Sequence, residues 1–295
     1  MVERTVAGLL VAGHEVVLLT STPDQAGIEK MPGLTIYRIK PGNIFFYSIA
    51  HLHNWLSRLV WHVVDIFNWG AAKQIKTVIE NEKPEVVHTH NLMGLSFLLP
   101  RVIRKLGIRH IHTVHDVQLV EPSGMILKQY EHTWHYHGLG ARAYTALMRK
   151  LLGSPAVVIS PSQFLREFYL TRGFFPESKV TIVRNPLTFA LAPVLEKKDE
   201  GVIAFLYVGQ IESHKGVVEL VQAFLNLNKN LAVELHVVGG GSELAKVKTL
   251  SEQDSRIKVY GRVERPDLPG IFAKMDVTVV PSLCYENSPT VIFES

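Results

Sequence analysis

Short apolar runs recur along the whole chain, and segments with helical periodicity lie between most of them. Each run is four to six residues long, which suits a β-strand. Short apolar strands that alternate with helices are typical of parallel sheets covered by helices on both faces. The pattern therefore predicts an α/β fold. The runs are residues 15–20, 34–39, 85–90, 110–114, 156–160, 180–183, 203–208, 234–238, 257–260 and 276–280.

The length of the chain and one charged segment predict two domains. At 295 residues the chain exceeds the usual size of a single domain. Residues 195–201, a charged segment that follows Pro193, have the composition of a linker. We therefore expect two Rossmann-like domains, residues 1–190 and 191–295. The chain opens on a helical segment where a doubly wound domain opens on a strand, so we expect the first strand to be missing.

Composition narrows the class of protein. The formal net charge of +4 is too small an excess to argue for a nucleic-acid partner. The single cysteine, Cys284, excludes an internal disulfide and suits a reducing compartment. No segment reaches the ~18 uncharged apolar residues of a membrane-spanning helix, and the first residues lack the basic start of a signal peptide. These features predict a cytoplasmic protein.

Two glycine-containing turns in the second half follow predicted strands, and ligands of such sheets bind at the carboxyl ends of strands. Lys215 stands just before a predicted helix, where free backbone N–H groups and the helix dipole favour an anion. A solvated surface lysine is the simpler interpretation of that residue alone. The other turn, residues 239–243, contains glycines that let a ligand approach the backbone. Leu244 replaces the third glycine of the dinucleotide fingerprint, which argues against a dehydrogenase.

The last twelve residues place two glutamates around a strand–loop–helix joint. Glu286 falls in the loop after the predicted strand 276–280, and Glu294 falls about one and a half turns into the next helix. We expect Ser288 to cap this helix and Pro289 to take its first position. One carboxylate can then face a ligand from the loop while the other lies on the helix. Two ordinary solvated acids remain the alternative interpretation.

These segments, taken in order, resemble the retaining glycosyltransferases of family four. FLYVGQIESHKGVVELVQAF (205–224) resembles the family's phosphate-holding strand, loop and helix. YGRV (260–263) and PDLPGIFAKMDVTVVPS (266–282) resemble the stretch that lines the nucleotide base, and ENSPTVIFE (286–294) is similar to the E-x(7)-E signature. The resemblance spans nearly the whole chain. It implies the GT-B architecture, with an acceptor-side first domain and a nucleotide-sugar-binding second domain.

The resemblance implies a hexosyltransferase that uses a UDP- or GDP-type sugar donor and requires neither a metal nor another cofactor. Lys215 would neutralise the leaving diphosphate, Glu286 would hold the sugar hydroxyls, and Glu294 would bind the ribose. Gln210 stands where the family usually has an arginine, which predicts weaker binding of the diphosphate. The other donor-binding residues implied by the resemblance are Gly209, Gln210, Gly240, Arg262, Val263, Asn287 and Ser288.

Histidines gather at two predicted strand ends in the first half of the chain. They invite a metal site, but no cysteine cluster and no obvious carboxylate set beyond Asp116 accompanies them, so we predict none. The resemblance implies instead that His115 contacts the reacting sugar, with Asp116 orienting its ring or the loop. His90 and Asn91 are secondary candidates. The histidines are His88, His90, His110, His112 and His115.

The aromatic segment 44–69 has three open interpretations. It could face the acceptor, touch a membrane, or form a buried helix pair, and we favour the buried pair because charges are few. The acceptor would be a glycan, a lipid-linked molecule or a small molecule, and peripheral contact with the cytoplasmic face of a membrane stays open.

Two other functions remain. The chain could be a GT-B epimerase, which needs no separate acceptor. It could also be an inactive, truncated relic that acts as a binding module, since the family's last helix continues beyond the position of Ser295. On this reading the second domain is incomplete, and the isolated chain is not expected to be active.

Overall fold

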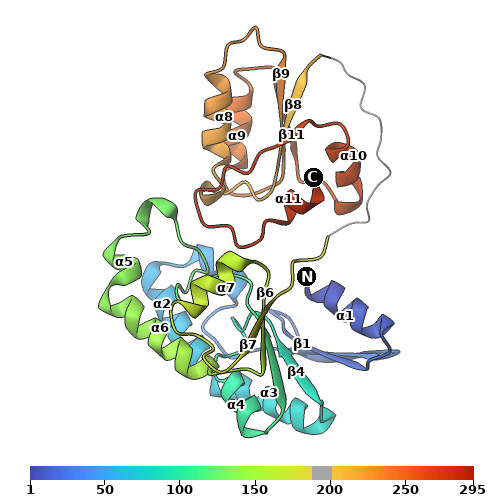
Figure 1. Cartoon of the computed structure of the whole chain (residues 1–295), viewed down its shortest axis with the longest axis vertical. Coiled ribbons are helices and arrows are strands. Elements are labelled where there is room, and N and C mark those ends of the chain that lie inside the picture. The colour runs from blue at the N-terminus through green and yellow to red at the C-terminus, as the bar shows by residue number, and fades with distance from the viewer. Residues whose placement is uncertain (188–200) are drawn as a thin grey trace. The chain divides into compact units, whose positions relative to one another are not determined.

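The computed structural model describes residues 1–187 and 201–295 and divides the chain into two compact units (Figure 1). Unit 1 comprises Met1–Met125 and Thr133–Arg184, and unit 2 comprises Ile126–His132 and Asn185–Ser295. The predicted domain boundary at residue 190 lies outside the described residues, as does the predicted linker 195–201 apart from Gly201.

Unit 1 contains two sheets that share no strand. In the smaller sheet β1 pairs with β3 in parallel and β2 pairs with β3 antiparallel, whereas the larger sheet is parallel throughout. The sequence of β2, GIEKM, contains no apolar run, and every residue of the strand is exposed. This strand was therefore not predicted. In spatial order the strands are β1 (Val16–Ser21), β3 (Leu34–Ile39) and β2 (Gly27–Met31), then β4 (Val86–Thr89), β5 (Arg109–Thr113), β6 (Val157–Ser160) and β7 (Lys179–Ile182).

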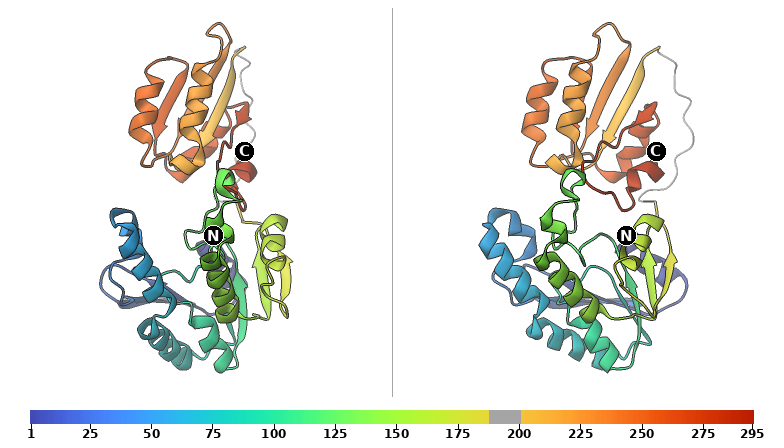
Figure 2. Two further views of the ribbon diagram at one scale, coloured as in Figure 1. Left: turned by 90° about the vertical axis from the view of Figure 1, so that its left-hand side faces the viewer. Right: turned by 60° about the vertical axis from the view of Figure 1, so that its left-hand side comes forward.

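Helices flank these sheets (Figure 2). Apolar side chains from the helices and the sheets fill the core of unit 1. The side chains of Ile103, Met148, Leu152 and Leu165 are fully buried. The helices are α1 (Val2–Val11), the 3-10 helix η1 (Tyr47–Leu52), α2 (Trp55–Ile66), α3 (Trp69–Glu82), α4 (Leu99–Lys105), α5 (Trp134–His137), α6 (Leu139–Leu152) and α7 (Gln163–Leu170).

Unit 2 has one parallel four-stranded sheet with an apolar cluster on each face. Val221, Leu235 and Val247 belong to the larger cluster, and Leu206 and Val238 to the smaller one. The strands are β10 (Ile257–Gly261), β9 (Val233–Val238), β8 (Ile203–Val208) and β11 (Val277–Thr278). The helices are η2 (Lys128–Tyr130), η3 (Ser213–Lys215), α8 (Val217–Leu225), α9 (Leu244–Ser251), η4 (Arg265–Asp267), α10 (Leu268–Phe272) and α11 (Thr290–Glu294).

The α/β prediction is confirmed, and two local predictions are wrong. The structure makes Pro289 the N-cap of α11, and the hydroxyl of Ser288 is buried with no hydrogen bond to a described residue. The segment 44–69 is not a buried helix pair, because α2 buries only its inner side and leaves its outer apolar side chains exposed. No helix within residues 1–187 and 201–295 is long and apolar enough to cross a membrane.

Candidate functional site

The loops that follow β8 and β9 lie against each other at the carboxyl edge of the sheet in unit 2. The N–H of Gly209 donates to the carbonyl of Val238 (3.0 Å), and the N–H of Ile211 donates to the carbonyl of Gly240 (2.9 Å). Glu212 accepts bonds from both the N–H and the hydroxyl of Ser242, at 2.9 and 2.6 Å. These contacts bring Gly209, Gln210 and Gly240, which we predicted as donor-binding residues, onto adjacent loops.

Two glycines permit this close approach. Gly239 has φ +145°, and a Cβ there would lie 1.8 Å from the carbonyl oxygen of Gly209. Gly216 has φ +67°, and its Cβ would lie 2.2 Å from the carbonyl oxygen of Pro281. Neither position accepts a side chain without a backbone shift. A Cβ on Gly240, by contrast, would meet nothing within 4 Å, so the backbone at this position borders open space.

Lys215 and Glu286 form an ion pair at this edge. The ammonium of Lys215 lies 2.6 Å from Oε1 of Glu286, and the hydroxyl of Ser282 donates to the same oxygen at 2.6 Å. Both charged side chains are largely buried, with exposed fractions of 22% and 24%. Among the described residues, no donor bonds Oε2 of Glu286, so this oxygen remains able to accept a hydrogen bond from a ligand.

The surroundings keep Glu286 ionised at neutral pH. Burial of the carboxylate favours its neutral form, but the hydrogen bonds from Lys215 and Ser282 and the charge of Lys215 outweigh that cost, so the pKa of Glu286 lies below its ordinary value. Burial, together with the charge of Lys215, lowers the pKa of His214. Neutral His214 therefore adds no charge beside the ammonium of Lys215 and the carboxylates of Glu286 and Glu212.

Residues 126–132 brace the loop that carries Glu286, and sequence reasoning missed this segment. Leu127 and Cys284 form an antiparallel bridge, the N–H of Lys128 donates to the carbonyl of Leu283 at 3.0 Å, and the hydroxyl of Tyr285 donates to the carboxylate of Glu131. Residues 126–132 lie between β5 and α5 in sequence, so no local signal in the chain indicates that they pack in unit 2.

The residues after Glu286 leave buried acceptors without partners. Oδ1 of Asn287 and the hydroxyl oxygen of Ser288 are buried and make no hydrogen bond to any described side chain or backbone group. Asn185 donates weakly to the carbonyl of Ser288 (3.5 Å), but its own Oδ1 is also unpaired within the described part of the chain. Buried polar atoms are normally paired, so this loop suits a polar ligand. Glu294 is the last residue of α11 and is partly exposed.

The predicted base-lining residues follow β10 along the same edge. The N–H of Gly239 donates to the carbonyl of Gly261 at 2.8 Å, which ties the ends of β9 and β10 together. Arg262 projects into solvent with 85% of its side chain exposed and lies 3.9 Å from Glu264. Val263 packs against the smaller apolar cluster. Within the described residues, neither Arg262 nor Val263 forms a hydrogen bond or an ion pair with Lys215 or Glu286.

A pocket in unit 1 gathers the candidates predicted in the first half of the chain. His90, Asn91, His115 and Asp116 all line it, and Nδ1 of His90 lies 3.0 Å from Nε2 of His115. Burial lowers the pKa of His115 to about 4 and that of His90 to about 3, so both rings are neutral at pH 7 and one donates to the other.

Asp116 accepts two hydrogen bonds in the loop of this pocket. Its side-chain Oδ1 accepts the N–H of Gln118 (2.9 Å), and its backbone carbonyl accepts the hydroxyl of Tyr169 (2.6 Å). The other three histidines bond threonines: His88 bonds Thr113, while His110 and His112 both bond Thr89. In residues 1–187 and 201–295, no three His, Cys, Asp or Glu side chains form a group that could hold a metal ion.

Comparison with protein families agrees with this geometry. Residues 1–186 match the family described as "Glycosyl transferase 4-like domain". The chain belongs to this family. Residues 193–295 match a second family, "Glycosyl transferases group 1". The protein is therefore a glycosyltransferase.

Two relatives match most of this glycosyltransferase chain. An "uncharacterized 42.6 kDa protein in cps region" of Klebsiella pneumoniae is 24% identical over 265 residues, which cover 89% of this chain and 68% of the relative. An "uncharacterized glycosyltransferase" of Methanocaldococcus jannaschii is 23% identical over 305 residues, covering 98% of this chain and 71% of the relative.

Solved structures establish the fold class of the glycosyltransferase. Sucrose-phosphate synthase from Thermosynechococcus elongatus matches with a TM-score of 0.68 at 18% identity, over 99% of this chain and 71% of that one. Anabaena HepE in complex with UDP matches with a TM-score of 0.56 at 15% identity, over 88% and 64%. The fold is that of the GT-B glycosyltransferases, as the sequence predicted.

Proposed function

We propose that this glycosyltransferase moves a hexosyl group from a nucleoside-diphosphate sugar to an acceptor, with retention of the anomeric configuration. The observation that carries the proposal is the Lys215–Glu286 pair at the carboxyl edge of the sheet, beside a turn whose Gly240 borders open space. A UDP-type donor is favoured because HepE was solved with UDP. A GDP-type donor is the alternative.

Lys215 is proposed to neutralise the diphosphate as it leaves. Its ammonium has three donors, and Glu286 uses one of them, so two remain for phosphate oxygens. The residue also directly precedes Gly216, the N-cap of α8, where backbone N–H groups favour an anion. In other enzymes a metal ion places a fixed positive charge where negative charge develops. Because Lys215 can do this here, we propose a reaction that requires no metal.

Glu286 is proposed to hold the sugar. With Oε1 occupied by Lys215 and Ser282, Oε2 can accept a hydroxyl of the sugar ring. The unpaired oxygens of Asn287 and Ser288 are proposed to take further hydrogen bonds from the donor. Glu294 is proposed to bind the ribose, and Gly209, Gln210, Arg262 and Val263 to line the rest of the donor site.

Retention is proposed to follow from attack by the acceptor on the side of the leaving group, through an oxocarbenium-like transition state. His115, as a neutral imidazole, is proposed to contact the reacting sugar. The acceptor is proposed to be a glycan, a lipid-linked molecule or a small molecule in glycan or cell-envelope synthesis. Peripheral contact with the cytoplasmic face of a membrane belongs to the same proposal, because a lipid-linked acceptor lies there.

A thermal-shift series tests the donor site. A ligand that binds only the folded state raises the melting midpoint according to its concentration and Kd. UDP, GDP and ADP and their hexose conjugates should be compared on the wild type, on Glu286→Gln, and on Glu264→Gln, an exposed acid near the same edge (77% exposed). We expect one nucleotide family to raise the midpoint, and its sugar to raise it further except in Glu286→Gln.

Glu264→Gln is the control, and its melting midpoint should respond to nucleotides as that of the wild type does. A cooperative melt that no nucleotide moves would contradict the proposal and favour a module without a donor site. If a nucleotide sugar does bind, transfer of a labelled hexose to a mixed acceptor fraction would separate a transferase from an epimerase, which needs no acceptor.

A further inference from the structure

The outer side of α2 and its flanks exposes an unusual number of large apolar side chains. Globular proteins leave single apolar residues on their surface but rarely a continuous patch of them. We call this surface the α2 face. Its most exposed members are Leu52 (72%), Trp55 (72%), Leu56 (55%), Leu59 (52%), Val63 (51%) and Trp69 (68%).

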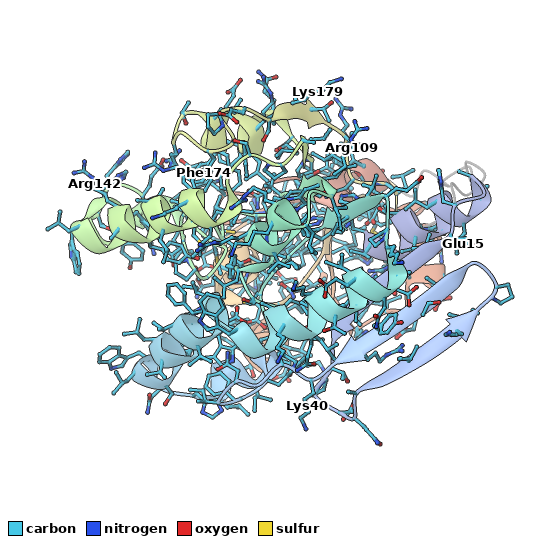
Figure 3. All side chains as sticks on the ribbon, turned by 90° about the horizontal axis from the view of Figure 1, so that it is seen from below. Glu15, Lys40, Arg109, Arg142, Phe174 and Lys179 are labelled. Atoms are coloured by element: carbon cyan, nitrogen blue, oxygen red, sulfur yellow. The ribbon has the colours of Figure 1, made fainter. Side chains whose placement is uncertain are left out.

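Helical spacing makes the α2 face a continuous stripe. Trp55, Leu59 and Val63 are four residues apart, so they lie above one another on one side of the helix. Trp61 and Asp65 lie on the other side and are buried, with 3% and 1% exposed. Figure 3 shows α2 at the edge of unit 1, with aromatic rings projecting away from the body of the unit. Within the described part of unit 1, no element covers the stripe.

The α2 face is held in place from the inside. The indole N–H of Trp61 donates to the carbonyl of Phe45 (2.7 Å), and Asn43 donates to the carbonyl of Trp61 (3.2 Å). Asn54 caps the helix by accepting the N–H of Ser57 (2.9 Å). These bonds fix the inner side of α2, so the outer apolar side chains are presented by a braced helix.

The exposed charged residue of α2 itself is basic. Between residues 41 and 79 the only acid is Asp65, which is buried, whereas Arg58 on α2 and Lys73 on α3 are exposed. Lys76 on α3 is offset by the exposed Glu80 at 3.2 Å. An apolar stripe that carries Arg58 and no exposed acid on its own helix is complementary to a surface that is apolar inside and anionic outside.

A bilayer fits this surface better than a folded protein does. Protein interfaces contain about one hydrogen bond per 100–200 Å² and a polar rim, but the stripe itself offers only hydrocarbon and indole. Indoles favour the boundary between lipid and water, and Trp55 and Trp69 mark the starts of two consecutive helices. The twelve residues of α2 are about 18 Å long, too short to cross a bilayer but suited to lying in its surface.

We propose that the α2 face binds the surface of an anionic lipid bilayer, with α2 lying in the plane of the interface. The proposal rests on the peripheral membrane contact proposed above and assigns it to one surface. It does not depend on a donor, so it can fail while the transferase function stands. Glycosyl transfer can likewise fail in an assay while lipid binding persists.

Vesicle flotation of the full chain tests the proposal. Vesicles of pure phosphatidylcholine should be compared with vesicles that contain one third phosphatidylglycerol, at low and high salt. We expect binding to the anionic vesicles, and a partition coefficient at least about tenfold lower for Trp55→Ser/Leu59→Ser because the buried apolar area is lost. Arg58→Gln should weaken binding to anionic vesicles about fivefold and leave binding to phosphatidylcholine unchanged.

A matched control removes exposed apolar side chains elsewhere. Ile28→Ser/Leu231→Ser changes residues that are 60% and 48% exposed, and it should bind vesicles as the wild type does. The proposal is overturned if the wild type does not float with anionic vesicles or if Trp55→Ser/Leu59→Ser floats equally well. It is also overturned if sedimentation shows self-association without lipid that this double variant abolishes while vesicle binding persists, since a second copy would then be the occupant.

Discussion

Adding one methyl group at Gly239 should destabilise the carboxyl edge of the sheet in unit 2. A Cβ there would lie 1.8 Å from the carbonyl oxygen of Gly209, whereas close carbon–oxygen contacts are normally about 3.3 Å or longer. The backbone must therefore shift by about 1.5 Å, and the N–H of Gly209 is hydrogen bonded to Val238 in the same turn. The φ of +145° adds roughly 1–3 kcal/mol of strain for any side chain.

Together these effects should lower the free energy of unfolding of unit 2 by about 3–5 kcal/mol, at the upper end of single substitutions. At a urea slope of about 2 kcal/mol/M, the midpoint falls by about 1.5–2.5 M. Circular dichroism must follow the transition, because all four tryptophans lie in unit 1. Tryptophan fluorescence then reports unit 1 and should not change.

Gly240→Ala is the matched control, since a Cβ at that position meets nothing within 4 Å and its φ is not positive. This variant should unfold as the wild type does yet bind the nucleotide more weakly, because the methyl group occupies the space proposed for the diphosphate. The reasoning is refuted if Gly239→Ala and Gly240→Ala have the same urea midpoint.

Three further predictions concern charges and a helix cap. Burial raises the pKa of Asp65 from 3.8 to about 7, so stability should fall as the pH rises through that window, by roughly 4 kcal/mol at most, and Asp65→Asn should flatten this dependence in urea titrations read by tryptophan fluorescence. The pKa of Glu286 lies below its ordinary value of 4.5, so the ionised carboxylate stabilises the fold at pH 7, and this stabilisation is lost as the pH falls through the lowered pKa. Lys215→Met should reduce the loss of stability on acidification, measured by circular dichroism between pH 3 and 7. The hydroxyl of Ser162 accepts the N–H of Leu165 at 3.2 Å, so Ser162→Ala should lower the free energy of unfolding of unit 1 by about 1 kcal/mol in a urea titration. An unchanged urea midpoint would show that the cap contributes nothing.

The strands of both units could be predicted from the sequence because apolar runs record burial on two faces. The run 203–208 coincides with β8, and 257–260 with all but the last residue of β10. The strand β2 could not be predicted, since its residues are exposed and only backbone pairing with β3 makes it a strand. The exposure of the α2 face could not be predicted either, because the sequence pattern of an apolar helix is the same whether a neighbouring element covers it or not.

The carboxyl edge of the sheet in unit 2 shows the same division between local and tertiary information. The sequence placed Lys215 before a helix and Glu286 after a strand, since each position follows from local patterns within a few residues. Their 2.6 Å contact joins positions 71 residues apart, and the brace from residues 126–132 joins still more distant positions. Side-chain type and spacing thus determined what chemistry the chain carries, while the order of the strands and the packing of the glycine turns decided which groups meet, because contacts between distant residues depend on the whole fold.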